Sequence, residues 1–128
     1  MRASRTFDGT SGSIAGARRL ATAFLGEVAA AEGQVIPDLV VDTAQLVVSE
    51  LVTNAVRHTD GPCGLDVELV NGAVELSVWD TSSQPVSVME RDPARVGRHG
   101  MEIVTALCGG FEVVPTAAGK RVVVRIPL

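Results

Sequence analysis

The chain has 128 residues, of which 46% are hydrophobic and 20% charged, a composition typical of a globular protein and unlike that of a disordered chain. Fifteen acidic against eleven basic residues give a net charge of −4, the wrong sign for a general nucleic-acid binder. No apolar run approaches the roughly 20 residues that cross a bilayer, and the first residues lack the apolar stretch of a secretory signal. We therefore expect a single cytoplasmic domain over residues 1–128, with no membrane and no direct nucleic-acid partner.

Cys63 and Cys108 lie far apart in the sequence, with no Cys-x-x-Cys pair and no paired histidine. This spacing predicts neither a structural zinc site nor, in a reducing compartment, a disulfide. We expect both cysteines to be small buried apolar residues.

The first predicted elements are a short strand over residues 2–7 and a helix over about 13–31. The helix is indicated by apolar residues at spacings of three and four, which form one stripe. These residues are Ile14, Ala17, Leu20 or Ala21, Phe24, Leu25 and Val28. Gly33 follows at a position where glycine commonly ends a helix.

Pro37 is typical of the first turn of a second helix, which we expect to run to about His58. Its apolar residues cover most of its circumference, namely Leu39, Val40, Leu46, Val47, Val48, Leu51, Val52, Ala55 and Val56. Such a helix is expected to be covered on two sides, by a sheet and by a neighbouring helix. The polar residues within it therefore need a separate reason.

A hairpin is predicted from strict alternation of apolar and polar residues on both sides of Asn71-Gly72, a dipeptide that favours a type I′ turn. If Val70 pairs with Ala73, the apolar residues of both strands fall on one face. They are Leu65, Val67, Leu69, Val74, Leu76 and Val78. One side of the hairpin then packs on the core and the other faces water.

Periodicity is lost between residues 81 and 96, which predicts a long loop, and loops of this length are usually functional or mobile. Residues 97–100 (Gly-Arg-His-Gly) are predicted to open a third helix over about 101–108, which Gly109 and Gly110 close.

A last hairpin is predicted from residues 111–114 and 121–126, and the valines of its second strand alternate with two arginines, Arg121 and Arg125. The element order is strand, two helices, two strands, one helix, two strands. This order indicates an α+β fold, a two-layer α/β sandwich with helices on one face of a mostly antiparallel sheet.

Glu50 and Asn54 lie four residues apart on the second predicted helix, so their side chains stack about 6 Å apart on one face, and His58 continues that line. An amide oxygen beside a carboxylate suits Mg²⁺ binding next to a group that orients or deprotonates a nucleophile. From spacing alone, a solvent-facing polar stripe is the stronger interpretation, because short motifs match by chance.

Asp80 ends an apolar strand, where its carboxylate can accept a hydrogen bond from an exocyclic amine such as that of adenine. The sequence Asp-Thr-Ser is also common in an Asx turn, and for Asp80 taken alone that is the stronger interpretation.

Gly97, Arg98, His99 and Gly100 combine backbone N–H groups, a cation and a helix N-terminus, which together attract phosphate. A plain loop-to-helix joint explains them about as well. For Lys120 beside Gly119, a hairpin turn flanked by bases is a stronger interpretation than phosphate contact.

The order of these features resembles the GHKL superfamily of ATP-binding domains. Residues 49–58 (Ser-Glu-Leu-Val-Thr-Asn-Ala-Val-Arg-His) are similar to its N box, in the form found in small bacterial anti-sigma-factor serine kinases. Residues 78–82 match the position of its G1 box, residues 97–101 that of its G2 box, and residues 119–122 its closing strand motif. The resemblance spans nearly the whole chain.

The resemblance implies the Bergerat fold, an α/β sandwich that agrees with the layer order above, and ATP with Mg²⁺ as cofactors. Asn54 would ligate Mg²⁺, and Glu50 would be the general base toward an acceptor hydroxyl. Asp80 would accept a hydrogen bond from the adenine amine. The implied nucleotide-binding set is Asn54, His58, Asp80, Thr81, Gly97, Arg98, His99, Gly100, Met101 and Lys120. Within it, residues 97–100 would form the hinge of a lid over the phosphates.

The leading hypothesis is a serine/threonine kinase of the anti-sigma type, which phosphorylates a serine on an anti-sigma-factor antagonist (a STAS-domain protein) and sequesters a sigma factor. The second is a nucleotide-sensing module that holds partners without phosphorylating them. The first is favoured by the presence of Glu50, and the second by the absence of both G1 glycines from residues 80–84 (Asp-Thr-Ser-Ser-Gln). The catalytic domain of a histidine kinase is disfavoured, because no helical phospho-acceptor segment precedes the domain. A homodimer is implied by the relatives alone.

Overall fold

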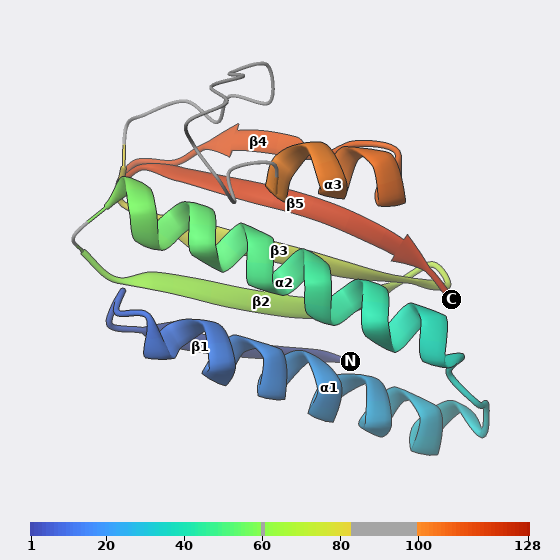
Figure 1. Cartoon of the computed structure of the whole chain (residues 1–128). Coiled ribbons are helices and arrows are strands. Elements are labelled where there is room, and N and C mark those ends of the chain that lie inside the picture. Colours follow the sequence, from blue (N-terminus) through green and yellow to red (C-terminus); the bar gives the residue numbers. More distant parts are fainter. Residues whose placement is uncertain (60, 83–99) are drawn as a thin grey trace.

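Five strands form one antiparallel sheet in the order β1-β2-β3-β5-β4, and three helices cover one of its faces in the computed structural model (Figure 1). The structure describes residues 1–59, 61–82 and 100–128, with the backbone alone for His58 and residues 100–103. The elements are β1 (Arg2–Phe7), α1 (Gly12–Glu32), α2 (Asp38–His58), β2 (Cys63–Val70), β3 (Ala73–Asp80), α3 (Gly100–Cys108), β4 (Glu112–Pro115) and β5 (Lys120–Pro127). The α+β class, the element order and the single helical layer are confirmed. The predicted loop lies, from residue 83 onward, outside the described residues.

The hairpin of β2 and β3 has the register that the alternation predicts. Val70 pairs with Ala73, and Asn71 and Gly72 both have positive φ angles, of 50° and 77°. A type I′ turn needs both of its central residues in this left-handed region, where asparagine and glycine are the least strained. The local sequence therefore fixes which face of the sheet is apolar.

The ends of the helices also follow from local signals. α1 ends at Gly33, which adopts a left-handed conformation and donates its N–H to the carbonyl of Ala29. α2 begins directly after Pro37, and Gly109 and Gly110, both with positive φ, follow α3. The last hairpin begins one residue later than predicted, at Glu112, and β5 begins one residue earlier, at Lys120.

The core is aliphatic and lies between the sheet and the helices. α2 contributes its largest share, and the buried residues of this helix are Ala44, Val47, Val48, Leu51, Val52 and Ala55. By length and hydropathy alone, Asp38–Arg57 also matches a membrane span, with a mean hydropathy of 1.3. Its buried apolar residues pack on the sheet and on the neighbouring helices, as predicted, whereas Leu39 and Leu46 of the predicted apolar surface are exposed.

The two cysteines are free thiols. Cys63 is fully buried, as predicted, whereas Cys108 is only partly buried where it packs against the core. Burial raises the pKa of both thiols, and for Cys63 the charges of Asp80 and Asp8 raise it further. A thiol with a raised pKa is a poor nucleophile, so neither cysteine has the chemistry of a reactive site.

The sheet face away from the helices carries ion pairs across the strands. Asp66 on β2 accepts a short hydrogen bond from Arg121 on β5 and lies 3.6 Å from Arg2 on β1. The same Arg121 guanidinium donates to the Ser77 hydroxyl on β3 at 2.8 Å. These contacts link four strands on a face that no described helix covers.

Partial burial acts to raise the pKa of Asp66, but hydrogen bonds from Ser4 and Arg121 and the charges of Arg121 and Arg2 outweigh it and lower the pKa. The contribution of Asp66 to stability is therefore present above its unfolded pKa, and it is lost as pH falls through the lower folded-state pKa.

Replacement of Asp66 by Asn is expected to lower the free energy of unfolding by about 1 kcal/mol at pH 7, since the ion pairs are partly exposed. The difference between wild type and Asp66→Asn should shrink below about pH 4, where both proteins become neutral at this position. Urea titrations at several pH values measure it. A difference that stays constant down to pH 2 would show that the charge of Asp66 is not the cause.

Candidate functional site

A buried ion pair lies where β3 ends. Nζ of Lys120 is 3.1 Å from Oδ1 and 2.9 Å from Oδ2 of Asp80, and the two side chains are only 6% and 2% exposed. An isolated carboxylate at this depth would be costly, so the ammonium group is what permits Asp80 to be buried as an anion.

The pair is positioned by the register between β3 and β5, in which Asp80 lies opposite Lys120. Side chains alternate along each strand, and Val78 and Val122, two residues away, are in the core. Asp80 and Lys120 therefore point to the helix-covered side of the sheet. They place two charges at the rim of an otherwise apolar layer.

Gly119 lets the two strands approach at this point. A Cβ atom at Gly119 would lie 2.2 Å from the carbonyl oxygen of Asp80 and 2.7 Å from Cα of Thr81. Both atoms belong to the backbone, so no side chain could move aside to make room. The glycine of the closing motif is thus required by packing against the strand end.

Asp80 also makes the Asx turn that the sequence allowed as an alternative. Its Oδ1 accepts a hydrogen bond from the backbone N–H of Ser82 at 2.8 Å. The turn does not use up the carboxylate, which offers about four lone-pair sites. The described residues contribute one hydrogen bond from Ser82 and two contacts from Lys120.

The Asp80–Lys120 pair can take part in recognition of a purine base. The carboxylate keeps acceptor capacity for an exocyclic amine, and the ammonium group has a third N–H to donate to a ring nitrogen. The donor and acceptor types of the pair therefore match those that an adenine base requires.

The end of α2 meets the end of β3 beside this pair. The hydroxyl groups of Thr59, directly after α2, and Thr81, directly after β3, are 2.8 Å apart, and the Thr59 hydroxyl also accepts the N–H of Gly61 at 3.0 Å. Asn54 lies five residues before Thr59, which is about 7.5 Å along the helix axis. The last turns of α2 and the Asp80 carboxylate are therefore at the same end of the domain.

The half-buried Glu50 and Asn54 lie on one flank of α2. The opposite flank is marked by Gln45, whose side-chain amide donates to Thr22 of α1 at 2.9 Å. Asn54 follows Gln45 by nine residues, which at 100° per residue places it half a turn away. Since α2 lies between α1 and α3 (Figure 1), Glu50 and Asn54 are on the α3 side of the helix.

For several of the other predicted site residues the structure describes only the position in the chain. His58 is the last residue of α2, Gly100 and Met101 are the first two of α3, and Thr81 is exposed beside Asp80. The predicted lid residues Gly97, Arg98 and His99 lie outside the described residues.

Among residues 1–59, 61–82 and 100–128, no group of three or more His, Cys, Asp or Glu residues could hold a metal ion. The resemblance assigns Mg²⁺ one ligand among the described residues, Asn54, and Mg²⁺ accepts few protein ligands because it retains several waters.

The sequence did not reveal that Lys120 is the partner of Asp80. Nucleotide contact by Lys120 stays a prediction of the resemblance, while in this structure the Lys120 ammonium group lies on the Asp80 carboxylate. The alternation along each predicted strand does place both residues at inward-facing positions. This alternation predicts their contact only if β5 is known to pair with β3.

The chain matches the family of histidine kinase-like ATPase domains over residues 10–126. The match covers most of the sequence, so the chain belongs to this family, and the implied GHKL-type fold is that of the structure. No curated protein matches the chain. Membership of an ATPase family implies that the domain binds ATP, with which the Asp80–Lys120 pair is compatible.

Replacement of Lys120 by Met is expected to destabilise the protein by about 3–5 kcal/mol, because a buried carboxylate loses its partner. The double variant Asp80→Asn/Lys120→Met should recover part of this loss, since the charge is removed with its partner. Urea unfolding of wild type, both single variants and the double variant measures the coupling. Additive losses in the double variant would contradict a buried pair.

A Cβ atom at Gly119 has no room, so Gly119→Ala is expected to lower the stability by about 1–3 kcal/mol and to separate the ends of β3 and β5. The matched control is Gly26→Ala in α1, where a Cβ atom meets nothing within 4 Å. That change should raise the stability by about 0.5–1 kcal/mol through helix propensity. Thermal unfolding of both variants tests this, and equal effects would contradict the close approach.

Proposed function

We propose that the domain is an ATP-dependent serine/threonine protein kinase of the anti-sigma-factor type. It phosphorylates a serine on an anti-sigma-factor antagonist, a STAS-domain protein, and it sequesters a sigma factor. The proposal is supported by membership of the ATPase family and by the resemblance of residues 49–58 to the N box of such kinases. The proposal includes a cytoplasmic location and a homodimer, the latter implied by the resemblance, with no membrane or nucleic-acid partner.

The observation that carries the proposal is the presence of Glu50 together with Asn54 on the α3 side of α2. A domain that only held ATP would need the amide at position 54 but no carboxylate one turn earlier. A kinase needs a base within reach of the acceptor hydroxyl, and a half-buried glutamate on a rigid helix suits that role.

Each residue then has a separate task. Asn54 would hold Mg²⁺ through its amide oxygen, and the ion would supply charge stabilisation to the transferred phosphoryl group. Glu50 orients the acceptor hydroxyl and accepts its proton. Asp80 accepts a hydrogen bond from the exocyclic amine of adenine. Lys120 compensates the charge of the buried carboxylate. Phosphoryl transfer asks for this combination of positioning and electrostatics more than for covalent chemistry.

A second function, a nucleotide-sensing module without kinase activity, is favoured by one observation. Lys120 already donates to the carboxylate that would receive the base, and residues 80–84 lack the glycines that let a backbone approach a nucleotide closely. In that case the domain binds partners differently with and without ATP and transfers nothing.

Incubation with labelled ATP, Mg²⁺ and candidate antagonist proteins separates the two functions. We expect label on a serine of the antagonist, reduced about 10²–10⁴-fold in Glu50→Gln, the effect of removing a general base. Glu68→Gln on β2 is the matched control, because Glu68 is half-buried like Glu50 but lies on the sheet face away from the helices, and it should retain full transfer. ATP binding without transfer to any candidate would favour the sensor.

Asn54→Ala is expected to abolish Mg²⁺-dependent nucleotide binding, because the amide oxygen is the one protein ligand that we assign to the ion. The control is Thr53→Ala, a half-buried position one residue away on the same helix, which should bind as wild type does. Isothermal calorimetry with and without Mg²⁺ measures both. An unchanged affinity in Asn54→Ala would remove this residue from the site.

A further inference from the structure

The segment from residue 20 to residue 56 contains no lysine, arginine or histidine, while it carries five acidic residues. Four of these, Glu27, Glu32, Asp38 and Asp42, are exposed around the connection between α1 and α2. None of the four has an ion-pair partner in the part of the chain that the structure describes. The charge at this corner of the domain is therefore negative and uncompensated.

Stability does not explain this placement. α1 ends at Glu32 with no basic residue in its last turn, although the partial negative charge of a helix C-terminus favours cations there. Of the acidic residues at the corner, Asp38 alone is at a favourable position, in the first turn of α2. An unfavourable charge that is retained on an exposed surface is more readily explained by binding.

Large apolar side chains are exposed at the same corner. Val35 is 88% and Leu39 is 76% exposed, which are the two highest values for large apolar residues in the described part of the chain. Leu46, seven residues after Leu39 on the same face of α2, is 38% exposed. Glu32 and Gln34, which precede Val35 in the chain, line a hollow of about 310 Å³ together with Val28, Leu69, Gly72 and Leu128.

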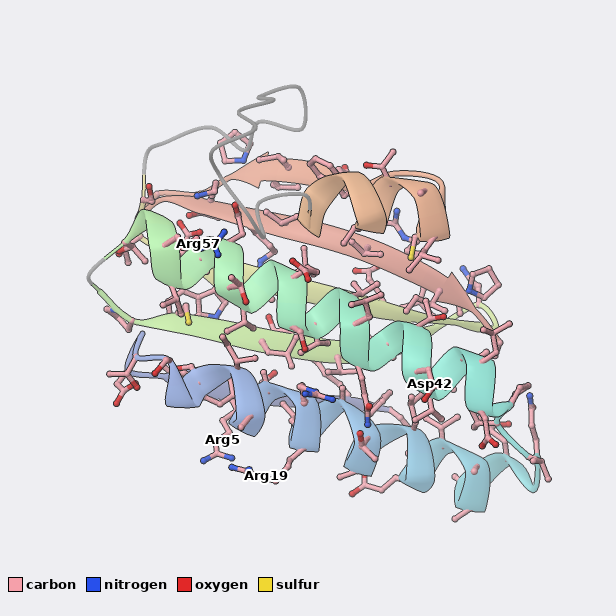
Figure 2. All side chains as sticks on the ribbon, in the orientation of Figure 1. Arg5, Arg19, Asp42 and Arg57 are labelled. Carbon is pink, nitrogen blue, oxygen red and sulfur yellow. The ribbon has the colours of Figure 1, made fainter. Side chains whose placement is uncertain are left out.

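These residues define one surface, which we call the α1–α2 corner. It consists of Glu27, Glu32, Val35, Asp38, Leu39, Asp42 and Leu46. Figure 2 shows Asp42 toward this corner, whereas Arg57 lies near the other end of α2. The corner is therefore at the opposite end of α2 from the end of β3 that carries Asp80 (Figure 1).

We propose that the α1–α2 corner is a docking surface for a basic amphipathic helix of a partner protein. The apolar face of such a helix covers Val35, Leu39 and Leu46, and its lysine or arginine residues pair with the surrounding carboxylates. Charge selects this occupant. A symmetric contact with a second copy would bring acidic residues together, and an anionic lipid surface would be repelled.

The proposal goes beyond the nucleotide site and does not depend on it, so its test is made without ATP or Mg²⁺. The probe is a fluorescent helical peptide of about 18 residues, with leucine on one face and lysine on the other. We expect it to bind the full chain, more weakly as salt rises, and to shift the backbone amide resonances of residues 27–46. A mirror peptide with glutamate in place of lysine should not bind.

The decisive variant is Leu39→Ser/Asp42→Lys, for which we expect the affinity to fall at least about tenfold, the loss of roughly one apolar anchor and one charge pair. The matched control Leu107→Ser/Glu112→Lys makes the same changes at exposed positions of α3 and β4 and should bind like wild type. Circular dichroism verifies that both variants fold.

Three results would overturn the proposal. The first is equal binding by both double variants, or no binding at all. The second is equal binding of the glutamate peptide, which would leave only apolar attraction. The third is concentration-dependent self-association, or binding to anionic vesicles, that Leu39→Ser/Asp42→Lys abolishes, since a second copy or a membrane would then be the occupant.

Discussion

The arrangement of the domain where the end of β3 meets the start of β5 depends on one buried interaction, the ion pair between Asp80 and Lys120. A carboxylate that is 2% exposed is tolerated only with a partner of opposite charge, so the pairing of β3 with β5 and the chemistry at their ends are one constraint. The close approach at Gly119 belongs to the same constraint, because the two strands must touch where the charges meet. The apolar core can therefore end in a polar group that still has hydrogen-bonding capacity for a ligand.

Three sides of α2 have different neighbours: the sheet, α1, and the flank opposite α1. Residues such as Leu51 and Ala55 are buried against the sheet, Gln45 faces α1, and Glu50 and Asn54 lie on the opposite flank. Since packing already occupies the first two directions, polar residues on the third flank are not needed for stability. This is the physical reason for treating them as a candidate site, and membership of the ATPase family is consistent with that interpretation.

The two proposals use opposite ends of the same helix. The carboxyl-terminal end of α2 meets β3 next to Asp80, while the α1–α2 corner lies around the amino-terminal half of α2 and the end of α1. A regulatory domain of this design would bind its nucleotide and its partner without direct competition between them. Any coupling would pass through α2, whose buried apolar face holds it rigidly on the sheet.

The sequence by itself determined the local structure: the helix ends, the β2–β3 register and the apolar face of each strand. These features depend on residues a few positions apart, such as Asn71 and Gly72 in the turn, because backbone conformation and side-chain alternation are local interactions. Resemblance to a family added ATP, which no single motif established. The tertiary structure alone decided that β5 lies between β3 and β4, and so brought Lys120 to Asp80, forty positions earlier, and Arg121 to Asp66. Strand order results from burial summed over the whole chain, and no local pattern encodes it.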